Sequence, residues 1–293
     1  MPRCAVRHVE PSGVRRQTSG LAAFLGLTYL IAIPLWIAGT RWKSVAVPGL
    51  PIVDTLMVLC PLLAASLMTW RGGTAHDVAR LLMSAGDLRR IPSVAWYAPS
   101  LLIAPCASLL SDAWMRARGD AACIGNISPA HVLLLFVSFL VGAASEEVGW
   151  TAYATARLRA RASLLMTGVV IGSAEAAWHV IQLVQIGRSS TWIGWWCLWT
   201  MSARVLMVYL YDETTSVFTA VMFHASMNLG WQLFPDRCSH WDPRLNGWIL
   251  AAVAGIVAAS TTCAGRIAPP GSIAGRSSSD RHQPCPHGRR RIP

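Results

Sequence analysis

The sequence predicts an all-α protein, a polytopic membrane helix bundle with about eight transmembrane helices. Of its 293 residues, 54% are hydrophobic and only 13% are charged, whereas soluble domains carry about 25% charged residues. The apolar residues also come in blocks of about 20, the length that an α-helix needs to cross a bilayer. Together these observations exclude an ordinary soluble domain.

Eight apolar blocks are long enough to be membrane spans. The first contains Pro34 and has no clear cleavage site of small residues, so we expect a retained helix rather than a signal peptide. The fourth is long enough to tilt or to protrude. The fifth and the seventh are only weakly apolar, because each contains a histidine and another polar residue. The expected spans are residues 20–38, 49–69, 92–111, 131–158, 163–185, 191–211, 214–232 and 246–263.

The charge distribution orients these spans. The net charge is +11, and most of the 25 Lys and Arg residues fall in segments on the same side as the two ends of the chain. Cytoplasmic segments carry the excess of basic residues in membrane proteins, so both termini are expected in the cytoplasm and the protein in the cell membrane. The basic charge then indicates contact with anionic lipid and no nucleic-acid partner.

Composition divides the chain into three parts: a basic cytoplasmic leader at 1–18, one integral membrane domain at 19–263, and a disordered basic cytoplasmic tail at 264–293. Within the domain, apolar residues recur at helical spacing between Asp77 and Arg90, which predicts a helix lying on the membrane surface. Cys123 and Cys238 both fall in expected outer loops, where a disulfide between them is a possible pairing.

Two adjacent glutamates, Glu146 and Glu147, lie inside the fourth span. A carboxylate is costly in hydrocarbon, and such residues usually face a bundle interior or a wet cavity where they serve function. With about 1.5 Å of rise per residue, His179, His224 and Asn228 on two later spans fall at a similar depth. A lone buried histidine or asparagine is usually a partner in helix–helix packing, but the glutamate pair has no obvious local partner and therefore favours a functional site.

The residue types at this depth suit peptide hydrolysis without a covalent nucleophile. A carboxylate that meets an imidazole across two helices can act as a general base toward water. His224 and Asn228 share one helix face at i, i+4 and can donate hydrogen bonds to a developing oxyanion. Glu175 and His179 share a face in the same way.

These motifs resemble those of the CPBP family, the CAAX-protease and bacteriocin-processing (Abi) intramembrane proteases, which include CAAX prenyl protease 2-like proteins. The family motif EExxxR reads EEVGWT from Glu146 to Thr151, FxxxH reads EAAWH from Glu175 to His179, and HxxxN reads HASMN from His224 to Asn228. The resemblance covers about residues 75–232, and the family's usual eight-helix fold agrees with the expected number of spans.

The resemblance implies a role for each matching residue. Glu146 would activate the hydrolytic water with help from His179. His224 and Asn228 would stabilise the oxyanion, and Glu147 would support the site. Family members have been described as metalloproteases, so Zn²⁺ held by Glu146, His179 and His224 is left open beside a metal-free glutamate mechanism, which we favour.

Two positions depart from the family pattern, because Thr151 replaces the expected arginine and Glu175 the expected phenylalanine. At about 1.5 Å per residue, Arg204 in the sixth span lies at the depth of Thr151, and we expect it to substitute as the charge partner of the glutamates. Glu175 could orient His179 or join a metal site.

The expected function is therefore an intramembrane endopeptidase that cleaves a membrane-associated peptide or protein, prenylated or bearing a leader peptide, among membrane lipids. A catalytically inactive relative that binds a membrane partner or confers immunity is the main alternative, because of Thr151 and Glu175. A transporter or proton relay is a further one, although the sequence lacks the repeats expected of many transporters. The substrate and the oligomeric state are left open.

Overall fold

A computed structural model describes residues 11–42, 45–47, 50–119, 128–233 and 241–263. The tail at 264–293, most of the leader, and both Cys123 and Cys238 lie outside these residues, so the disulfide stays untested. The first helix already begins at Pro11, inside the expected leader, and continues to Gly39.

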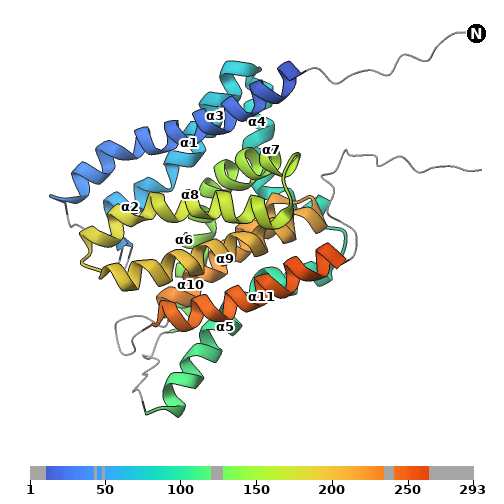
Figure 1. Cartoon of the computed structure of the whole chain (residues 1–293). Coiled ribbons are helices and arrows are strands. Elements are labelled where there is room, and N and C mark those ends of the chain that lie inside the picture. Colours follow the sequence, from blue (N-terminus) through green and yellow to red (C-terminus); the bar gives the residue numbers. More distant parts are fainter. Residues whose placement is uncertain (1–10, 43–44, 48–49, 120–127, 234–240, 264–293) are drawn as a thin grey trace, which may run out of the picture.

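The described residues form a bundle of helices (Figure 1). A hairpin of two short strands, β1 (Val45–Val47) and β2 (Leu50–Pro51), is the one departure from helix and turn among them. The all-helical prediction is therefore confirmed. The longer helices are α1 (Pro11–Gly39), α3 (Leu59–Gly72), α5 (Tyr97–Ala117), α6 (Pro129–Glu147), α8 (Leu164–Gln185), α9 (Ser190–Thr214), α10 (Val217–Leu233) and α11 (Pro243–Cys263).

Seven segments of the described chain are long and apolar enough to cross a membrane. They match seven of the eight expected spans, and the remaining one, 214–232, corresponds to α10, which has 17 residues. At about 1.5 Å per residue, α10 is roughly 26 Å long, close to the hydrocarbon thickness of about 30 Å. About eight spans is consistent with this architecture.

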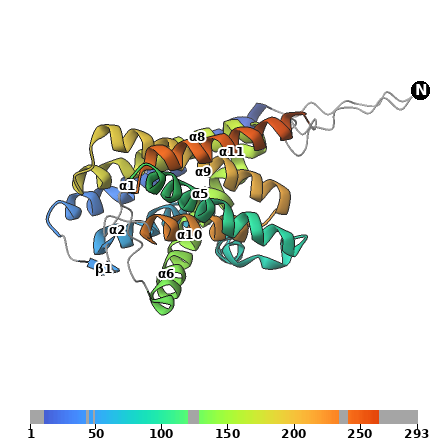
Figure 2. The ribbon, with the colours of Figure 1, turned by 90° about the horizontal axis from the view of Figure 1, so that it is seen from below.

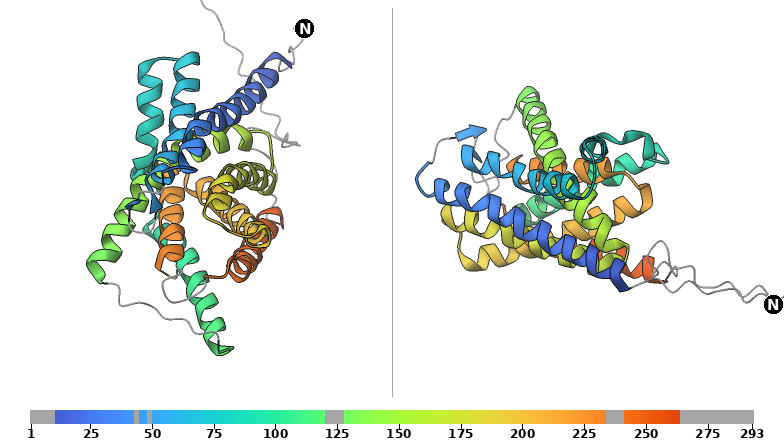
Figure 3. Two further views of the ribbon diagram at one scale, coloured as in Figure 1. Left: turned by 90° about the vertical axis from the view of Figure 1, so that its left-hand side faces the viewer. Right: turned by 90° about the horizontal axis from the view of Figure 1, so that it is seen from above.

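Helix α9 is the most buried of the spans and lies in the middle of the bundle. It packs between α8 and α11, which run beside it in Figure 1, and it also contacts α10. Helix α10 in turn packs against α5 and α6, and α6 leaves the bundle at a steep angle to the others (Figures 2 and 3). Large apolar side chains such as Leu133, Val141 and Ile256 remain exposed on the outside, as expected for surfaces that face lipid.

Small residues allow the central helices to approach closely. A Cβ added to Gly168 of α8 would lie 2.6 Å from the Cα of Val205 in α9, and one added to Gly172 would lie 2.9 Å from the Cα of Met201. Membrane helices rely on such small residues at their contacts, because lipid gives little hydrophobic force to bring helices together. These two glycines therefore set how closely α8 and α9 approach.

The segment expected on the membrane surface is helical over Ala75–Met83 (α4), and two short 3₁₀ turns, η1 (Ser84–Gly86) and η2 (Leu88–Arg90), follow it. The first turn of α4 is capped reciprocally by Thr74 and Asp77. Hydrogen bonds from the hydroxyl and amide of Thr74 lower the pKa of Asp77 to about 2, so this cap is ionised at neutral pH.

Candidate active site

Four helices bring five charged or titratable side chains to one buried place. Glu146 and Glu147 come from the end of α6, Glu175 from α8, Arg204 from α9 and His224 from α10. Each of these residues is less than 5% exposed to solvent. Burial of so many ionisable groups is stable only when they are paired and hydrogen-bonded, so the contacts between them define the site.

The helix that carries the two adjacent glutamates changes its form directly after them. Helix α6 ends at Glu147, and the chain continues as a π-helical segment, η4 (Val148–Thr155), before the single turn of α7 (Ala156–Arg159). Wide turns of this kind inside helices are frequent at functional sites. The segment lies tightly against α3, because a Cβ on Gly149 would be 2.7 Å from the carbonyl oxygen of Pro61. Only glycine fits this approach.

Arg204 lies between two carboxylates. Its Nε and Nη2 donate to the two oxygens of Glu175, each at 2.7 Å, and its Nη1 and Nη2 donate to the two oxygens of Glu147, at 2.6 and 2.9 Å. The guanidinium therefore makes two bidentate ion pairs, which are the strongest geometry for this pair of groups.

Thr151 and His224 complete the surroundings of Glu147. The Thr151 hydroxyl donates to Glu147 Oε2 at 2.5 Å and accepts from Nη1 of Arg204 at 3.2 Å. The Nδ1 atom of His224 lies 2.7 Å from the other oxygen of Glu147. Since a carboxylate accepts hydrogen bonds, Nδ1 is the donor. Glu147 thus fixes the orientation of His224 and leaves its Nε2 atom directed elsewhere.

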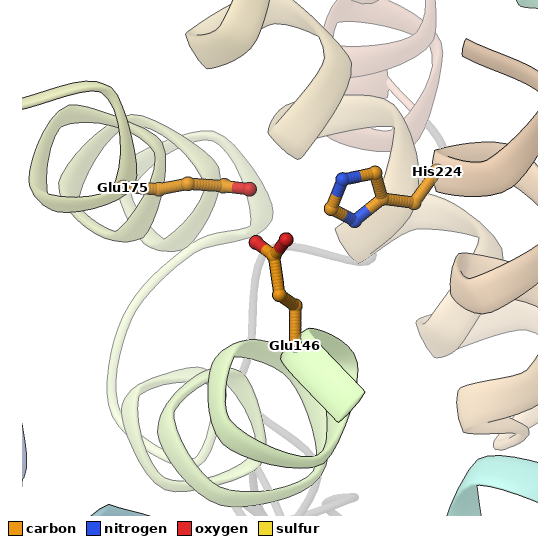
Figure 4. A group of neighbouring side chains, drawn as sticks. All are labelled: Glu146, Glu175 and His224. Carbon is orange, nitrogen blue, oxygen red and sulfur yellow. The ribbon is translucent and has the colours of Figure 1, made fainter. Parts of the chain in front are cut away.

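Glu146 differs from its neighbour, because its Oε2 atom is buried and has no hydrogen-bond partner among the described residues. The side chain points toward Glu175 and His224 (Figure 4). One nitrogen or oxygen from each of these three residues lies within 4.8 Å of the others. This spacing encloses a position that a water molecule or a cation can occupy in contact with all three.

His179 and Asn228 are not members of this group. The Nδ1 atom of His179 is 2.8 Å from the amide oxygen of Gln182, and its ring contacts Trp178 and Trp196, with centroids 4.6 and 5.3 Å apart. Asn228 follows His224 by one turn of α10 and is half-buried. The three residues suggested for Zn²⁺ are therefore not the three that meet, because Glu175 occupies the place expected for His179.

The sequence did not single out Thr151 or Gln182 as partners. Thr151 appeared only as a departure from a motif, although its i, i+4 spacing from Glu147 was a sign that the two side chains could meet. Gln182 follows His179 at i, i+3, a spacing that also allows two side chains on a helix to meet. Of the two roles that the sequence suggested for Glu175, orienting His179 is not what the structure shows, since Arg204 holds both of its oxygens. Its place beside Glu146 and His224 agrees with the other, a metal site.

These features define a class of protein: an integral membrane protein with a buried, charged site made from residues of several spans. Comparison with known proteins agrees with this class, because residues 128–230 are similar to the family model for Rce1-like type II CAAX prenyl endopeptidases. That segment runs from α6 through α10 and carries every residue of the site. The resemblance to CAAX proteases drawn from the three motifs is confirmed over it, and at this level the match supports a peptide hydrolase. A search of curated proteins gives no match.

Proposed function

We propose that the protein is an intramembrane endopeptidase that cleaves a membrane-associated peptide or protein by attack of an activated water. The observation that carries this proposal is the unpartnered Oε2 of Glu146, buried beside Glu175 and His224. A structural glutamate at this depth would be expected to have its oxygens satisfied. A catalytic base instead needs a free oxygen within reach of the water that it deprotonates.

The reaction uses these groups in sequence. Glu146 takes a proton from water while the water oxygen forms a bond to the carbonyl carbon of the peptide. The resulting oxyanion accepts hydrogen bonds from His224 and Asn228, the pair on one face of α10. When the C–N bond breaks, the leaving amine takes the proton back from Glu146. Each proton and electron pair is accounted for without a covalent enzyme intermediate.

Neighbouring residues position the reacting groups. Glu147 holds His224 through Nδ1, and Arg204 holds Glu147. His179 donates through Nδ1 to Gln182, which leaves its Nε2 atom as an acceptor. From there it can assist in orienting the water or the substrate. A prenylated or leader-bearing substrate is the finer part of the proposal, and it rests on the family match.

The test is processing of membrane peptides by three proteins expressed at equal levels: the wild type, Glu146→Gln and His224→Ala. A co-expressed pool of membrane peptides, together with one C-terminal peptide offered with and without a farnesyl group, is analysed by quantitative mass spectrometry. We expect cleavage by the wild type and a loss of at least about 100-fold in both variants, the usual effect of removing a general base or an oxyanion donor.

Asp112→Asn is the matched control, because Asp112 is a buried carboxylate of α5 paired with Arg116 and is absent from the site. It should cleave like the wild type. Equal cleavage by the wild type and Glu146→Gln would overturn the proposal. Absence of cleavage by the wild type on every substrate would favour the inactive relative or the transporter. A preference for the farnesylated peptide would decide the substrate class.

A further inference from the structure

The group formed by Glu146, Glu175 and His224 has the composition of a metal site. Its three residues come from α6, α8 and α10, and each offers one ligand atom within 4.8 Å of the other two. All three are buried. In Figure 4 the three side chains converge on one point from three different helices. Ligands separated in sequence but fixed on packed helices form a preorganised site.

The unpartnered oxygen of Glu146 points independently to a ligand. The residue is 4% exposed, and its Oε2 atom has no hydrogen-bond partner among the described residues. Burial of a polar group without a hydrogen bond is unfavourable, and burial of an uncompensated charge is far more so. Coordination of a cation, directly or through water, satisfies this atom.

The balance of charge points the same way. The site contains three carboxylates, Glu146, Glu147 and Glu175, and one permanent cation, Arg204, which contacts the last two. With His224 neutral, two negative charges remain uncompensated in the interior of a membrane protein. A divalent cation bound at this place neutralises both charges.

We propose that Glu146, Glu175 and His224 bind one divalent transition-metal cation, Zn²⁺ or Mn²⁺, through two carboxylates and an imidazole. Carboxylate ligands suit Mn²⁺, imidazole suits Zn²⁺, and both cations accept a mixed set. Three protein ligands with one open position are the usual arrangement at catalytic Zn²⁺. A cation bound there would polarise water, and it would stabilise the oxyanion in place of the hydrogen bond from His224, whose Nε2 would then be a ligand.

The residues around the three ligands support the assignment. Metal-binding histidines usually donate their second ring nitrogen to a carboxylate, and ligating carboxylates are themselves hydrogen-bonded. His224 contacts Glu147 through Nδ1, which leaves Nε2 for the metal, and Glu175 is held by Arg204. A metal site would also explain why Glu175 replaces the phenylalanine of the motif, because its carboxylate supplies the third ligand.

This proposal adds a cofactor to the proposed peptidase site, but metal binding is measured without any substrate. The full-length protein is purified in detergent, stripped with a chelator, reloaded with Zn²⁺ or Mn²⁺ and passed through gel filtration. Metal per chain is measured by inductively coupled plasma mass spectrometry, and thermal unfolding is followed in parallel. We expect one equivalent of one of these ions and a higher Tm in the loaded protein.

Two variants and two controls make the result specific. Glu146→Gln and Glu175→Gln should weaken binding by about 10-fold or more, since even the loss of an orienting neighbour costs about 10–100-fold. Glu146→Gln should fold like the wild type, because no described residue hydrogen-bonds the Oε2 atom of Glu146. A loss of metal in this variant therefore reports on the site and not on folding. Asp112→Asn and His131→Gln should bind like the wild type. Both site variants keep every cysteine, so ions held by thiols would persist in them.

The outcomes separate this proposal from the proposed function. A wild type without stoichiometric metal, or metal that persists in both site variants, overturns the cation site. Cleavage of peptides by metal-free protein overturns the cation site but keeps the peptidase. Stoichiometric metal without any cleavage keeps the cation site and removes the peptidase.

Discussion

At the scale of single residues, Arg204 holds the site together. Its guanidinium is 0% exposed and contacts two carboxylates and one hydroxyl. In the related motif an arginine follows the two glutamates from the same helix, at the position of Thr151. Here the cation arrives from α9, and the smaller Thr151 side chain leaves room for it while donating its own hydrogen bond to Glu147. Thr151 and Glu175, the two departures from the motif, thus both contact Arg204.

Arg204→Met should destabilise the protein strongly. The substitution leaves Glu147 and Glu175 buried without their cation, and breaking a buried pair from one side typically costs about 3–5 kcal/mol. Thermal unfolding in detergent should show a markedly lower Tm, and peptide processing should be lost. Arg244→Met is the control, because the exposed pair of Arg244 with Asp242 belongs to a class worth about 0–1 kcal/mol. An unchanged Tm and activity in Arg204→Met would contradict this role.

A second substitution should restore part of the loss. In the Arg204→Met background, Thr151→Arg places a guanidinium one helical turn from Glu147, as in the related motif. We expect the double variant to have a higher Tm than Arg204→Met, whereas Thr151→Arg alone should destabilise the wild type by adding a second buried cation beside Arg204. If the double variant is no more stable than Arg204→Met, the two arginine positions are not interchangeable.

At the scale of elements, the contact of α8 with α9 positions the site. Gly172 lies where a Cβ would be 3.0 Å from the Cβ of Arg204, and Gly168 lies one turn away against Val205. Because Glu175 is on α8 and Arg204 is on α9, the separation of these helices sets the length of their ion pair. The wide turns of η4 follow Glu147 directly, and they carry Thr151, whose hydroxyl donates to Glu147.

Gly168→Ala should therefore destabilise the protein, although alanine normally favours a helix. Its Cβ would lie 2.6 Å from the Cα of Val205, and such overpacking typically costs about 1–3 kcal/mol. Gly194→Ala in α9 is the matched control, because nothing lies within 4 Å of the added Cβ. It should be neutral or stabilise by up to about 1 kcal/mol. Thermal unfolding of both variants measures the contrast, and a Gly168→Ala variant as stable as Gly194→Ala would refute the close contact.

At the scale of the whole molecule, the number of crossings decides the topology. Within the described residues, seven segments have the length and hydropathy expected of a span, and α10 is shorter. Yet α10 carries His224 and Asn228 and packs against α5, α6 and α9 inside the bundle. Its neighbours cover most of its surface, so it does not need the strongly apolar sequence of a helix that faces lipid.

Reporter fusions test the arrangement. If α10 crosses the membrane, the eight crossings place both termini on one side, and the distribution of basic residues predicts that this side is the cytoplasm. A reporter that is active only in the cytoplasm should then be active at either terminus, and a reporter that is active only outside should be inactive at both. A reporter inserted between α5 and α6 should lie outside. Termini on opposite sides would show that the number of crossings is odd.

The sequence by itself determined the helical class, the positions of the spans and the residues at mid-membrane depth. These properties are local, because hydropathy and i, i+4 spacing depend only on residues near one another in the chain. It also placed His224 with Asn228, and Glu175 with His179, on shared helix faces. Even the expected pairing of Arg204 with the glutamates came from counting depth along separate helices.

Only the tertiary structure decided which of these side chains meet. The rotation of each helix about its axis determines whether Glu175 or His179 faces Glu146, and that rotation follows from packing between helices rather than from the sequence of one. The structure places Glu175 in the group and turns His179 toward Gln182. It also leaves Glu146 with a free oxygen while Glu147 takes the ion pairs, a difference between adjacent identical residues that arises only from their surroundings.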